Sequence, residues 1–182
     1  KTMKVRSINL EVSVEYFKNN LDWAIADAIW KVNIIFNLFQ KNNINPAEVI
    51  EIGCGAGENL VELLKRDGHI QKLSGYDISP QATALANKKA SVKICFYNED
   101  FAVKENINTD LMLVIDVVEH VDDFYGFLRK LKSKSTFFVF HIPLDLSCRT
   151  IIKPNVLLQQ PQSDGHIHNY SKNLEEWFLQ DT

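Results

Sequence analysis

The sequence predicts an α/β fold, a doubly wound and mostly parallel sheet covered by helices on both faces. Short apolar runs alternate with stretches of helical periodicity, as they do where helices connect parallel strands. Several of these runs are apolar at nearly every position, which is typical of strands that are buried on both faces. A glycine-rich turn, Gly53-Cys54-Gly55-Ala56-Gly57, joins the first run to a helix. These three observations together favour an open sheet with a ligand site at one edge.

Composition sets limits on size and partners. The 182 residues are enough for one well-buried domain and few for two. Hydrophobic residues make up 46% and charged residues 24% of the chain, as in ordinary soluble globular proteins. The net charge of −3 does not favour a polyanionic partner. No run approaches the roughly 20 apolar residues of a membrane span, and three cysteines without a Cys-x-x-Cys pair favour a reducing cytoplasm.

The first part of the chain is predicted to be helical. Apolar residues recur at helical spacing from Phe17 to Phe39. Asn19-Asn20 divides a short first helix from a longer one that starts near Asp22. The segment 42–46, which contains three asparagines and a proline, is expected to end that helix.

Strands and helices are then predicted to alternate as far as the fifth strand. The strands are expected at Val49–Ile52, Leu73–Tyr76, Val92–Tyr97, Leu111–Ile115 and Thr136–Ile142. The helices are expected at Glu58–Arg66 with Gly68 as its C′ residue, from Ser79-Pro80 to about Ala90, and at Val121–Lys132. Residues 143–170 are expected to form a long loop, and Ser171 to cap a final helix.

The turn after the first strand indicates a nucleotide-type cofactor site. Glycine lets the backbone turn sharply and lets a ligand approach it, and the following helix points free N–H groups at the turn. The dinucleotide pattern Gly-x-Gly-x-x-Gly needs a small residue where this chain has Glu58, and no Lys-Ser or Lys-Thr follows as in a phosphate loop. Glu51, two residues before the first glycine, suits a cationic ligand instead. The turn therefore favours a nucleoside that carries an amino acid, and disfavours an NAD-dependent oxidoreductase.

Four motifs in order resemble the class I S-adenosylmethionine-dependent methyltransferases. They span Val49 to Ile142 and are Glu51-x-Gly53-Cys54-Gly55-x-Gly57, Tyr76-Asp77-Ile78-Ser79, Asn98-Glu99-Asp100-Phe101 and Asp116-Val117-Val118-Glu119-His120-Val121. Their wording is most similar to that of quinone-biosynthesis and related small-molecule methyltransferases. The resemblance implies S-adenosyl-L-methionine as cofactor, S-adenosyl-L-homocysteine as product and a small-molecule acceptor. It also implies one domain, in which residues 1–46 form an N-terminal helical cap and residues 47–182 the S-adenosylmethionine-binding body.

The resemblance gives each motif a role. The glycine turn lies against the methionine part of the cofactor, whose ammonium group Glu51 helps to hold. Asp77 accepts hydrogen bonds from the ribose hydroxyls, Asp100 reads the adenine amino group, and Asp116 lies beside the sulfonium. The residues expected to bind the cofactor are Glu51, Gly53, Cys54, Gly55, Gly57, Asp77, Ile78, Asp100, Phe101, Asp116 and Val117.

Histidines supply the candidate bases. Methyl transfer depends mainly on alignment and exclusion of water, and a base helps when the acceptor is a hydroxyl or an amine. Histidine suits this task near pH 7. His120, after the fourth motif, is the first candidate; His141, at the end of the fifth predicted strand, and His166 and His168, in the long loop, follow. For His141, packing against its neighbours is the competing prediction.

Two other functions stay open. Asp116, Glu119, His120 and one late histidine have residue types suited to a divalent metal, and this resembles the small-RNA 3′-terminal 2′-O-methyltransferases. Asp116 stands where those enzymes have glutamate, and the acidic net charge disfavours RNA, so we expect no metal and no nucleic-acid partner. The other is a non-catalytic methyltransferase fold that binds partners, against which the intact motifs argue. Family members add two strands after the final helix, and we expect these to be missing here; the sequence indicates no oligomeric state.

Overall fold

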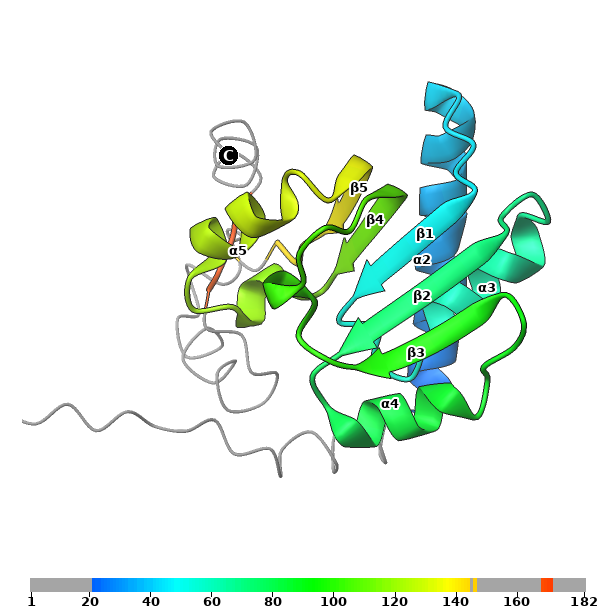
Figure 1. Ribbon diagram of the computed structural model, residues 1–182, viewed down its shortest axis with the longest axis horizontal. Helices are drawn as coiled ribbons and strands as arrows, with labels where there is room; N and C mark the ends of the chain where they lie inside the picture. Colours follow the sequence, from blue (N-terminus) through cyan, green and yellow to red (C-terminus); the bar gives the residue numbers. More distant parts are fainter. Residues whose placement is uncertain (1–20, 145, 147–167, 172–182) are drawn as a thin grey trace, which may run out of the picture.

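A five-stranded parallel sheet forms the centre of the molecule, with the strand order β3-β2-β1-β4-β5 (Figure 1). The computed structural model describes residues 21–144, 146 and 168–171. The strands are β1 (Glu48–Ile52), β2 (Lys72–Asp77), β3 (Ile94–Asn98), β4 (Thr109–Ile115) and β5 (Ser135–His141). Because every neighbouring pair is parallel, the carboxyl ends of all these strands lie at the same edge of the sheet. The predicted α/β fold is confirmed.

Helices and short turns cover both faces of the sheet. They are α2 (Leu21–Asn42), α3 (Glu58–Arg66), α4 (Pro80–Asn87), α5 (Phe124–Leu131) and the 3-10 turns η1 (Phe101–Val103) and η2 (Val118–His120). Side chains of β4 alternate between two cores, as the pleat requires. Leu111 and Leu113 join the core under α2, α3 and α4, whereas Met112 and Val114 join the core under α5. The sheet is therefore doubly wound.

The strand order reverses between β1 and β4. The chain runs from β1 through β2 to β3 at one edge of the sheet, and then returns to place β4 on the other side of β1 (Figure 1). Ligands of open α/β sheets bind beyond the carboxyl ends of the strands at such a reversal. The glycine turn follows β1 and Asp116 follows β4, so both lie at this point.

Two predicted boundaries need correction because of local caps. The helix α5 begins at Phe124, not at Val121, because the Asp123 carboxylate accepts a hydrogen bond from the Gly126 N–H at 2.8 Å and caps the helix there. The residues before it form the separate turn η2. The helix α4 ends at Asn87 rather than near Ala90.

Two further predictions fail for reasons of exposure and backbone conformation. Strand β3 starts at Ile94, since the side chain of Val92 is fully exposed and has nothing to pack against. Gly68 does not take the left-handed conformation expected of a C′ glycine. Instead the extended residue Asp67 ends α3, and its N–H donates to the Leu63 carbonyl at 3.0 Å.

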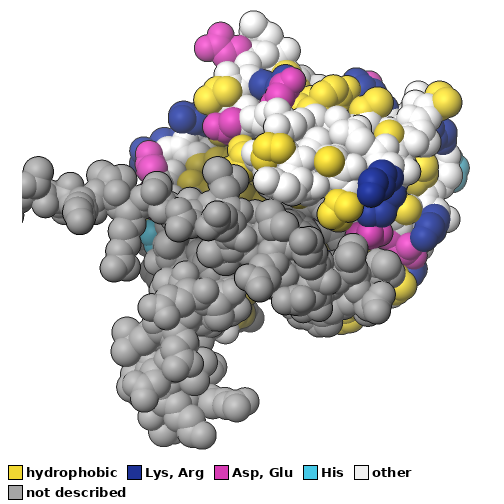
Figure 2. All heavy atoms as spheres, turned by 90° about the horizontal axis from the view of Figure 1, so that it is seen from below, with side chains coloured by type: hydrophobic (Ala, Val, Ile, Leu, Met, Phe, Trp, Pro, Cys, Tyr) yellow, Lys and Arg dark blue, Asp and Glu magenta, His cyan; other side chains and the backbone are white. Residues whose placement is uncertain are grey.

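The described surface carries charges of both signs. On the face shown in Figure 2, lysine and arginine side chains are interspersed with acidic and hydrophobic ones. None of the helices that the structure describes has the length and apolarity needed to cross a membrane. The helix predicted before residue 21, most of the loop 143–170 and the helix predicted after Ser171 lie outside the described residues.

Candidate active site

The turn between β1 and α3 requires glycine. Gly53, Gly55 and Gly57 all have positive φ angles, of 67°, 52° and 83°, in the region that side chains disfavour. Packing adds a second constraint at two of them. A Cβ atom at Gly53 would collide with Cγ2 of Val117, and a Cβ atom at Gly57 would lie 2.5 Å from the ring of Phe96. The pattern of glycines thus follows from both backbone conformation and close packing.

Hydrogen bonds tie this turn to the end of β2. The N–H groups of Gly53 and Cys54 both donate to the Tyr76 carbonyl, at 2.8 and 3.1 Å. The N–H of Gly55 donates to Oδ2 of Asp77 at 2.8 Å. The Cys54 side chain is buried in the core, and burial raises the pKa of its thiol. Cys54 is therefore placed to contribute through its backbone and not through its sulfur.

Asp77 joins the turn to the start of α4. Its Oδ1 atom accepts a hydrogen bond from the Ser79 N–H at 2.7 Å, and its Oδ2 atom accepts the one from Gly55. Burial raises the pKa of Asp77, although these two hydrogen bonds act in the opposite direction. Each carboxylate oxygen keeps a second lone pair, so Asp77 can still accept from a pair of ligand hydroxyls. The neighbouring Ile78 side chain is 74% exposed.

The two residues after β3 that are predicted to lie near the adenine differ in exposure: Asp100 is exposed and Phe101 is buried. Asp100 is exposed, and its Oδ1 atom accepts a hydrogen bond from the Ala102 N–H at 2.9 Å, which caps η1. Phe101 is only 1% exposed and packs under the ring of Tyr76, with 4.8 Å between ring centroids. The structure therefore places Asp100 at the surface of this edge and Phe101 beneath it, as a support for the loop.

Glu51 has a buried carboxyl group, and one of its two oxygens has no hydrogen-bond partner among the described residues. Its Oε1 atom accepts a hydrogen bond from Nδ2 of Asn59 at 2.7 Å, while its buried Oε2 atom has no partner among the described residues. Burial raises the pKa of Glu51 to about 8, although the hydrogen bond from Asn59 and the charge of Lys31 act to lower it. A buried polar atom without a partner is costly. The ammonium group of S-adenosylmethionine would supply the missing donor, so these residues fit the cofactor that the sequence resemblance implies.

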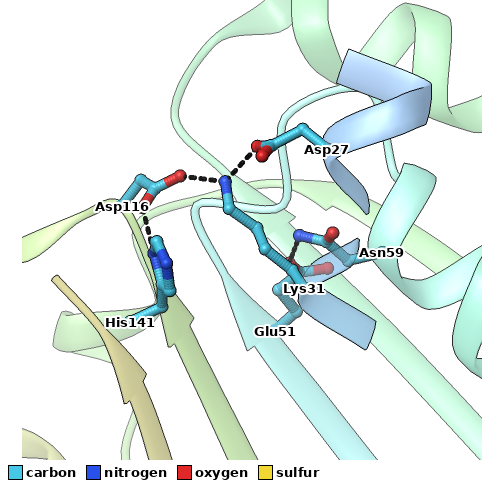
Figure 3. A network of polar contacts seen from close by, with 6 residues as sticks. All are labelled: Asp27, Lys31, Glu51, Asn59, Asp116 and His141. Atoms are coloured by element: carbon cyan, nitrogen blue, oxygen red, sulfur yellow. Dashed lines mark hydrogen bonds and ion pairs between the residues drawn. The ribbon is translucent and has the colours of Figure 1, made fainter. Parts of the chain in front are cut away.

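Asp116 lies at the centre of a second polar network, which crosses from β4 to α2 and β5 (Figure 3). Its Oδ2 atom pairs with the Lys31 ammonium, and its Oδ1 atom lies 2.6 Å from Nδ1 of His141. Burial would raise the pKa of Asp116, but hydrogen bonds from His141 and Lys31 outweigh it and lower the pKa. The same lysine also pairs with Asp27, one turn earlier on α2. Asp116 is therefore an ionised carboxylate between a cation and an imidazole.

The predicted histidines do not form one cluster. His141 lies at the end of β5, with the ring of Trp30 edge-on at 5.9 Å between centroids. His120 is exposed at the end of η2. Nε2 of His168 forms a hydrogen bond with the Val121 carbonyl at 3.0 Å, and His166 lies outside the described residues. Of the histidines described, His141 is the one bonded to a predicted cofactor residue.

Sequence reasoning missed Lys31. Asp27 and Lys31 have the spacing of an ordinary helical ion pair, which does not distinguish them from any surface pair. The contact with Asp116 joins residues 85 positions apart, and no local pattern predicts it.

Two other features lie apart from this edge. A cavity of about 260 Å³ is lined by residues of β1 and β2 and by the loop 106–108, and includes Lys72 and Ser74 toward the opposite end of the strands. Within the described ranges, no group of three or more His, Cys, Asp and Glu side chains is arranged to hold a metal ion. The metal alternative included late histidines, of which His166 is not described.

Comparison with known proteins gives one family and one relative. Residues 25–181 match the family model described as a methyltransferase domain. Norajmaline N-methyltransferase from Rauvolfia serpentina is 29% identical over 102 residues, which make up 52% of this chain and 34% of that enzyme. The chain therefore spans about a third of the length of the curated relative it matches.

Solved structures share the fold at low identity. A candidate O-methyltransferase from Nostoc punctiforme PCC 73102 superposes with a TM-score of 0.70 at 16% identity, over 93% of this chain and 53% of that one. The plantazolicin methyltransferase BpumL in complex with SAH superposes with a TM-score of 0.63 at 17% identity, over 94% of this chain and 68% of that one. At such identities the likeness shows the fold alone.

Proposed function

The chain belongs to the class I S-adenosylmethionine-dependent methyltransferases, and from this membership we propose that it transfers the methyl group of S-adenosylmethionine to a small-molecule acceptor. The observation that carries the proposal is the buried Oε2 atom of Glu51, which has no hydrogen-bond partner among the described residues. It lies beside a turn whose glycine spacing does not suit a pyrophosphate. A nucleoside that carries an ammonium group satisfies both features.

The cofactor-binding residues act by position and charge. The glycine turn admits the amino-acid part of the cofactor close to the backbone. Asp116 provides negative charge there, and Glu51, with a pKa of about 8 in the free protein, would ionise as the ammonium group binds. Asp77 has two free lone pairs for the ribose hydroxyls, and Ile78 and Asp100 are exposed at the adenine end. When bound, S-adenosylmethionine supplies a methyl group on a positively charged sulfur. The chain's own task is to hold this group in line with the acceptor and to exclude water.

His141 is better placed than His120 to act as the base. Asp116 accepts from Nδ1 of His141, so the neutral ring keeps its lone pair on Nε2. A hydroxyl or amine acceptor would give its proton to that atom as its oxygen or nitrogen takes the methyl group. The proposal thus gives His141 the role that the sequence assigned first to His120, with His166 and His168 as further candidates.

The net charge of the chain and its similarity to a small-molecule methyltransferase both support a small-molecule acceptor. The net charge of −3 and the mixed charges of the described surface suit a neutral or cationic small molecule better than RNA (Figure 2). The relative from Rauvolfia serpentina is named an N-methyltransferase of norajmaline. The closer likeness to quinone-biosynthesis enzymes stays a prediction, as does a cytoplasmic location, which the free thiols of Cys54 and Cys95 favour.

Transfer of a labelled methyl group tests this proposal. The protein is incubated with S-adenosylmethionine carrying a tritiated methyl group and with a cell extract separated into small molecules, peptides and proteins, and RNA. We expect label in the small-molecule fraction, and about tenfold less of it with the Asp77→Asn variant when the S-adenosylmethionine concentration lies below the dissociation constant. Label in the RNA fraction that disappears with a chelator would instead support the metal-dependent RNA methyltransferase. Binding of S-adenosylhomocysteine without labelling of any fraction would support a non-catalytic binding protein.

A further inference from the structure

Lys31 is an almost buried cation at the edge of the cofactor site. Only 9% of the residue is exposed, and its ammonium is bonded to both Asp27 and Asp116 (Figure 3). Burial alone would lower the pKa of Lys31, but the carboxylates of Asp116 and Asp27 outweigh it and raise the pKa. Lys31 is therefore charged, and it is held in place by groups on two different elements, α2 and the end of β4.

The ammonium of Lys31 has bonding capacity to spare. A lysine ammonium carries three N–H donors, and among the described residues two carboxylates engage it, those of Asp27 and Asp116. The third can donate to a ligand without breaking either pair.

Lys31 is also the cation that acts on Glu51. Of the charged groups in the described part of the chain that shift the pKa of Glu51, Asp77 and Asp116 raise it and Lys31 lowers it. Figure 3 shows the Lys31 side chain reaching over Glu51 toward Asp116. The ammonium and the carboxylate of an amino acid are attached to one carbon atom. A ligand whose ammonium meets Oε2 of Glu51 therefore brings its carboxylate close to Lys31.

Other lysines near the cofactor edge are engaged elsewhere. Nζ of Lys89 donates to the Ala56 carbonyl and pairs with Glu58, both at 2.7 Å, on the α4 side of the turn. Lys104 pairs with Glu99 and lies over the Tyr76 ring, near the adenine end of the predicted site. Neither acts on Glu51.

We propose that Lys31 binds the α-carboxylate of the amino-acid part of S-adenosylmethionine, while keeping its pairs with Asp27 and Asp116. The inference rests on the proposed function, since it names a residue of the same cofactor site. It makes Lys31 a cofactor-binding residue contributed by α2, from which its side chain reaches Asp116 after the end of β4. Glu51 and Lys31 would then bind the two opposite charges of one amino acid.

Calorimetric titration with two ligands tests this inference. S-adenosylhomocysteine has the carboxylate, and its decarboxylated analogue, S-adenosyl-3-thiopropylamine, has the same nucleoside and ammonium without it. We expect Lys31→Met to weaken S-adenosylhomocysteine about tenfold to a hundredfold. Its affinity for the analogue should stay the same or rise, because Asp116 loses its neutralising partner. Lys65→Met serves as the matched control, since the Lys65 ammonium is exposed on α3 and, among the described residues, pairs with Glu62; it should change neither affinity.

An equal loss for both ligands, or no loss for either, would overturn the inference and leave Lys31 as a structural pair between α2 and β4. Failure of the wild-type protein to bind either ligand would instead count against the proposed function. Should Lys31→Met not fold, wild-type protein labelled with ¹³C at lysine Cε gives the same decision. The Lys31 resonance, assigned with the Lys31→Arg variant, should shift with S-adenosylhomocysteine and not with the analogue; shifts that are the same for both would contradict the inference.

Discussion

Nδ1 of His141 lies 2.6 Å from Oδ1 of Asp116, across the carboxyl ends of the neighbouring strands β5 and β4. Burial alone would raise the pKa of Asp116, but hydrogen bonds from His141 and Lys31 outweigh it and lower the pKa. Asp116 is therefore ionised. An ionised carboxylate accepts only, so Nδ1 must carry the proton. The pair therefore fixes one tautomer of the imidazole and points the lone pair of Nε2 away from the carboxylate.

This geometry predicts the tautomer of His141. In a long-range ¹H–¹⁵N spectrum of the neutral ring, we expect the proton on Nδ1 in the wild type and a shift toward the Nε2–H tautomer in Asp116→Ala. The His120→Gln variant is the control and should leave the His141 signals unchanged. An Nε2–H tautomer of His141 in the wild type would contradict the proposed role of this residue as a base.

The buried carboxyl of Glu51 predicts a stability that falls as pH rises. Its pKa in the folded protein is about 8, above the value of 4.5 in the unfolded chain. Between these values the folded state holds a proton that the unfolded state has lost, so the free energy of unfolding decreases with pH, by at most about 1.4 kcal/mol per pH unit. Urea denaturation from pH 5 to pH 8 should show this decrease in the wild type and not in Glu51→Gln. The control Glu48→Gln, exposed at the other end of β1, should behave as the wild type does.

The same residue predicts release of a proton when the cofactor binds. An ammonium at Oε2 stabilises the ionised form of Glu51, so at pH 7 binding should release up to about one proton. Calorimetry with S-adenosylhomocysteine in buffers of different ionisation enthalpy measures this number directly. The affinity should rise with pH up to the Glu51 pKa of about 8. Proton release of the same size in Glu51→Gln would show that another group is responsible.

Asp77 and Asp110 offer a matched pair of variants. Both accept two backbone N–H groups: Asp77 from Gly55 and Ser79, and Asp110 from Ala47 and Glu48 at 2.8 and 2.9 Å. Changing either to asparagine should cost about 1 kcal/mol of stability through the lost backbone bonds. Only Asp77→Asn should also weaken S-adenosylhomocysteine, by about tenfold. Equal cofactor affinities for the two variants would mean that Asp77 supports the turn and does not bind the ribose.

Gly53 predicts a strong and local effect of adding one methyl group. Alanine at this position would hold a positive φ of 67° and collide with Val117, so we expect a loss of about 2 kcal/mol in unfolding free energy together with loss of cofactor binding. Gly68→Ala is the control, since nothing lies within 4 Å of the added atom, and it should keep or slightly raise the stability. Thermal melts and titration with S-adenosylhomocysteine measure both effects.

Local signals explain which parts of the fold were predictable. The predicted bounds of α3, Glu58–Arg66, agree with the structure at both ends. Both signals for this helix, the glycine turn before it and the apolar spacing within it, are local in the sequence. The start of α5 was not, because Val121 continues the apolar pattern while the cap at Asp123 decides where the helix begins. In the same way Val92 has the composition of a strand residue, but no partner in the sheet covers it.

The site shows the same limit more clearly. Glu51, Asp77 and the glycines belong to motifs whose positions follow from the order of strand, turn and helix, so the sequence predicted where they lie. The bonds of Asp116 to Lys31 and His141 join α2, β4 and β5, at separations of 85 and 25 residues. Such contacts depend on how the helix packs on the sheet. Sequence reasoning therefore ranked His120 before His141 and did not single out Lys31.

We propose that the glycine turn, Glu51 and Asp77 bind S-adenosylmethionine and not a dinucleotide. Calorimetric titration of the folded protein with S-adenosylhomocysteine and, separately, with NADH tests it most directly, with circular dichroism as the check on folding. We predict micromolar binding of S-adenosylhomocysteine, one ligand per chain, and no measurable binding of NADH. Folded protein that binds NADH, or that binds neither ligand, would contradict the account.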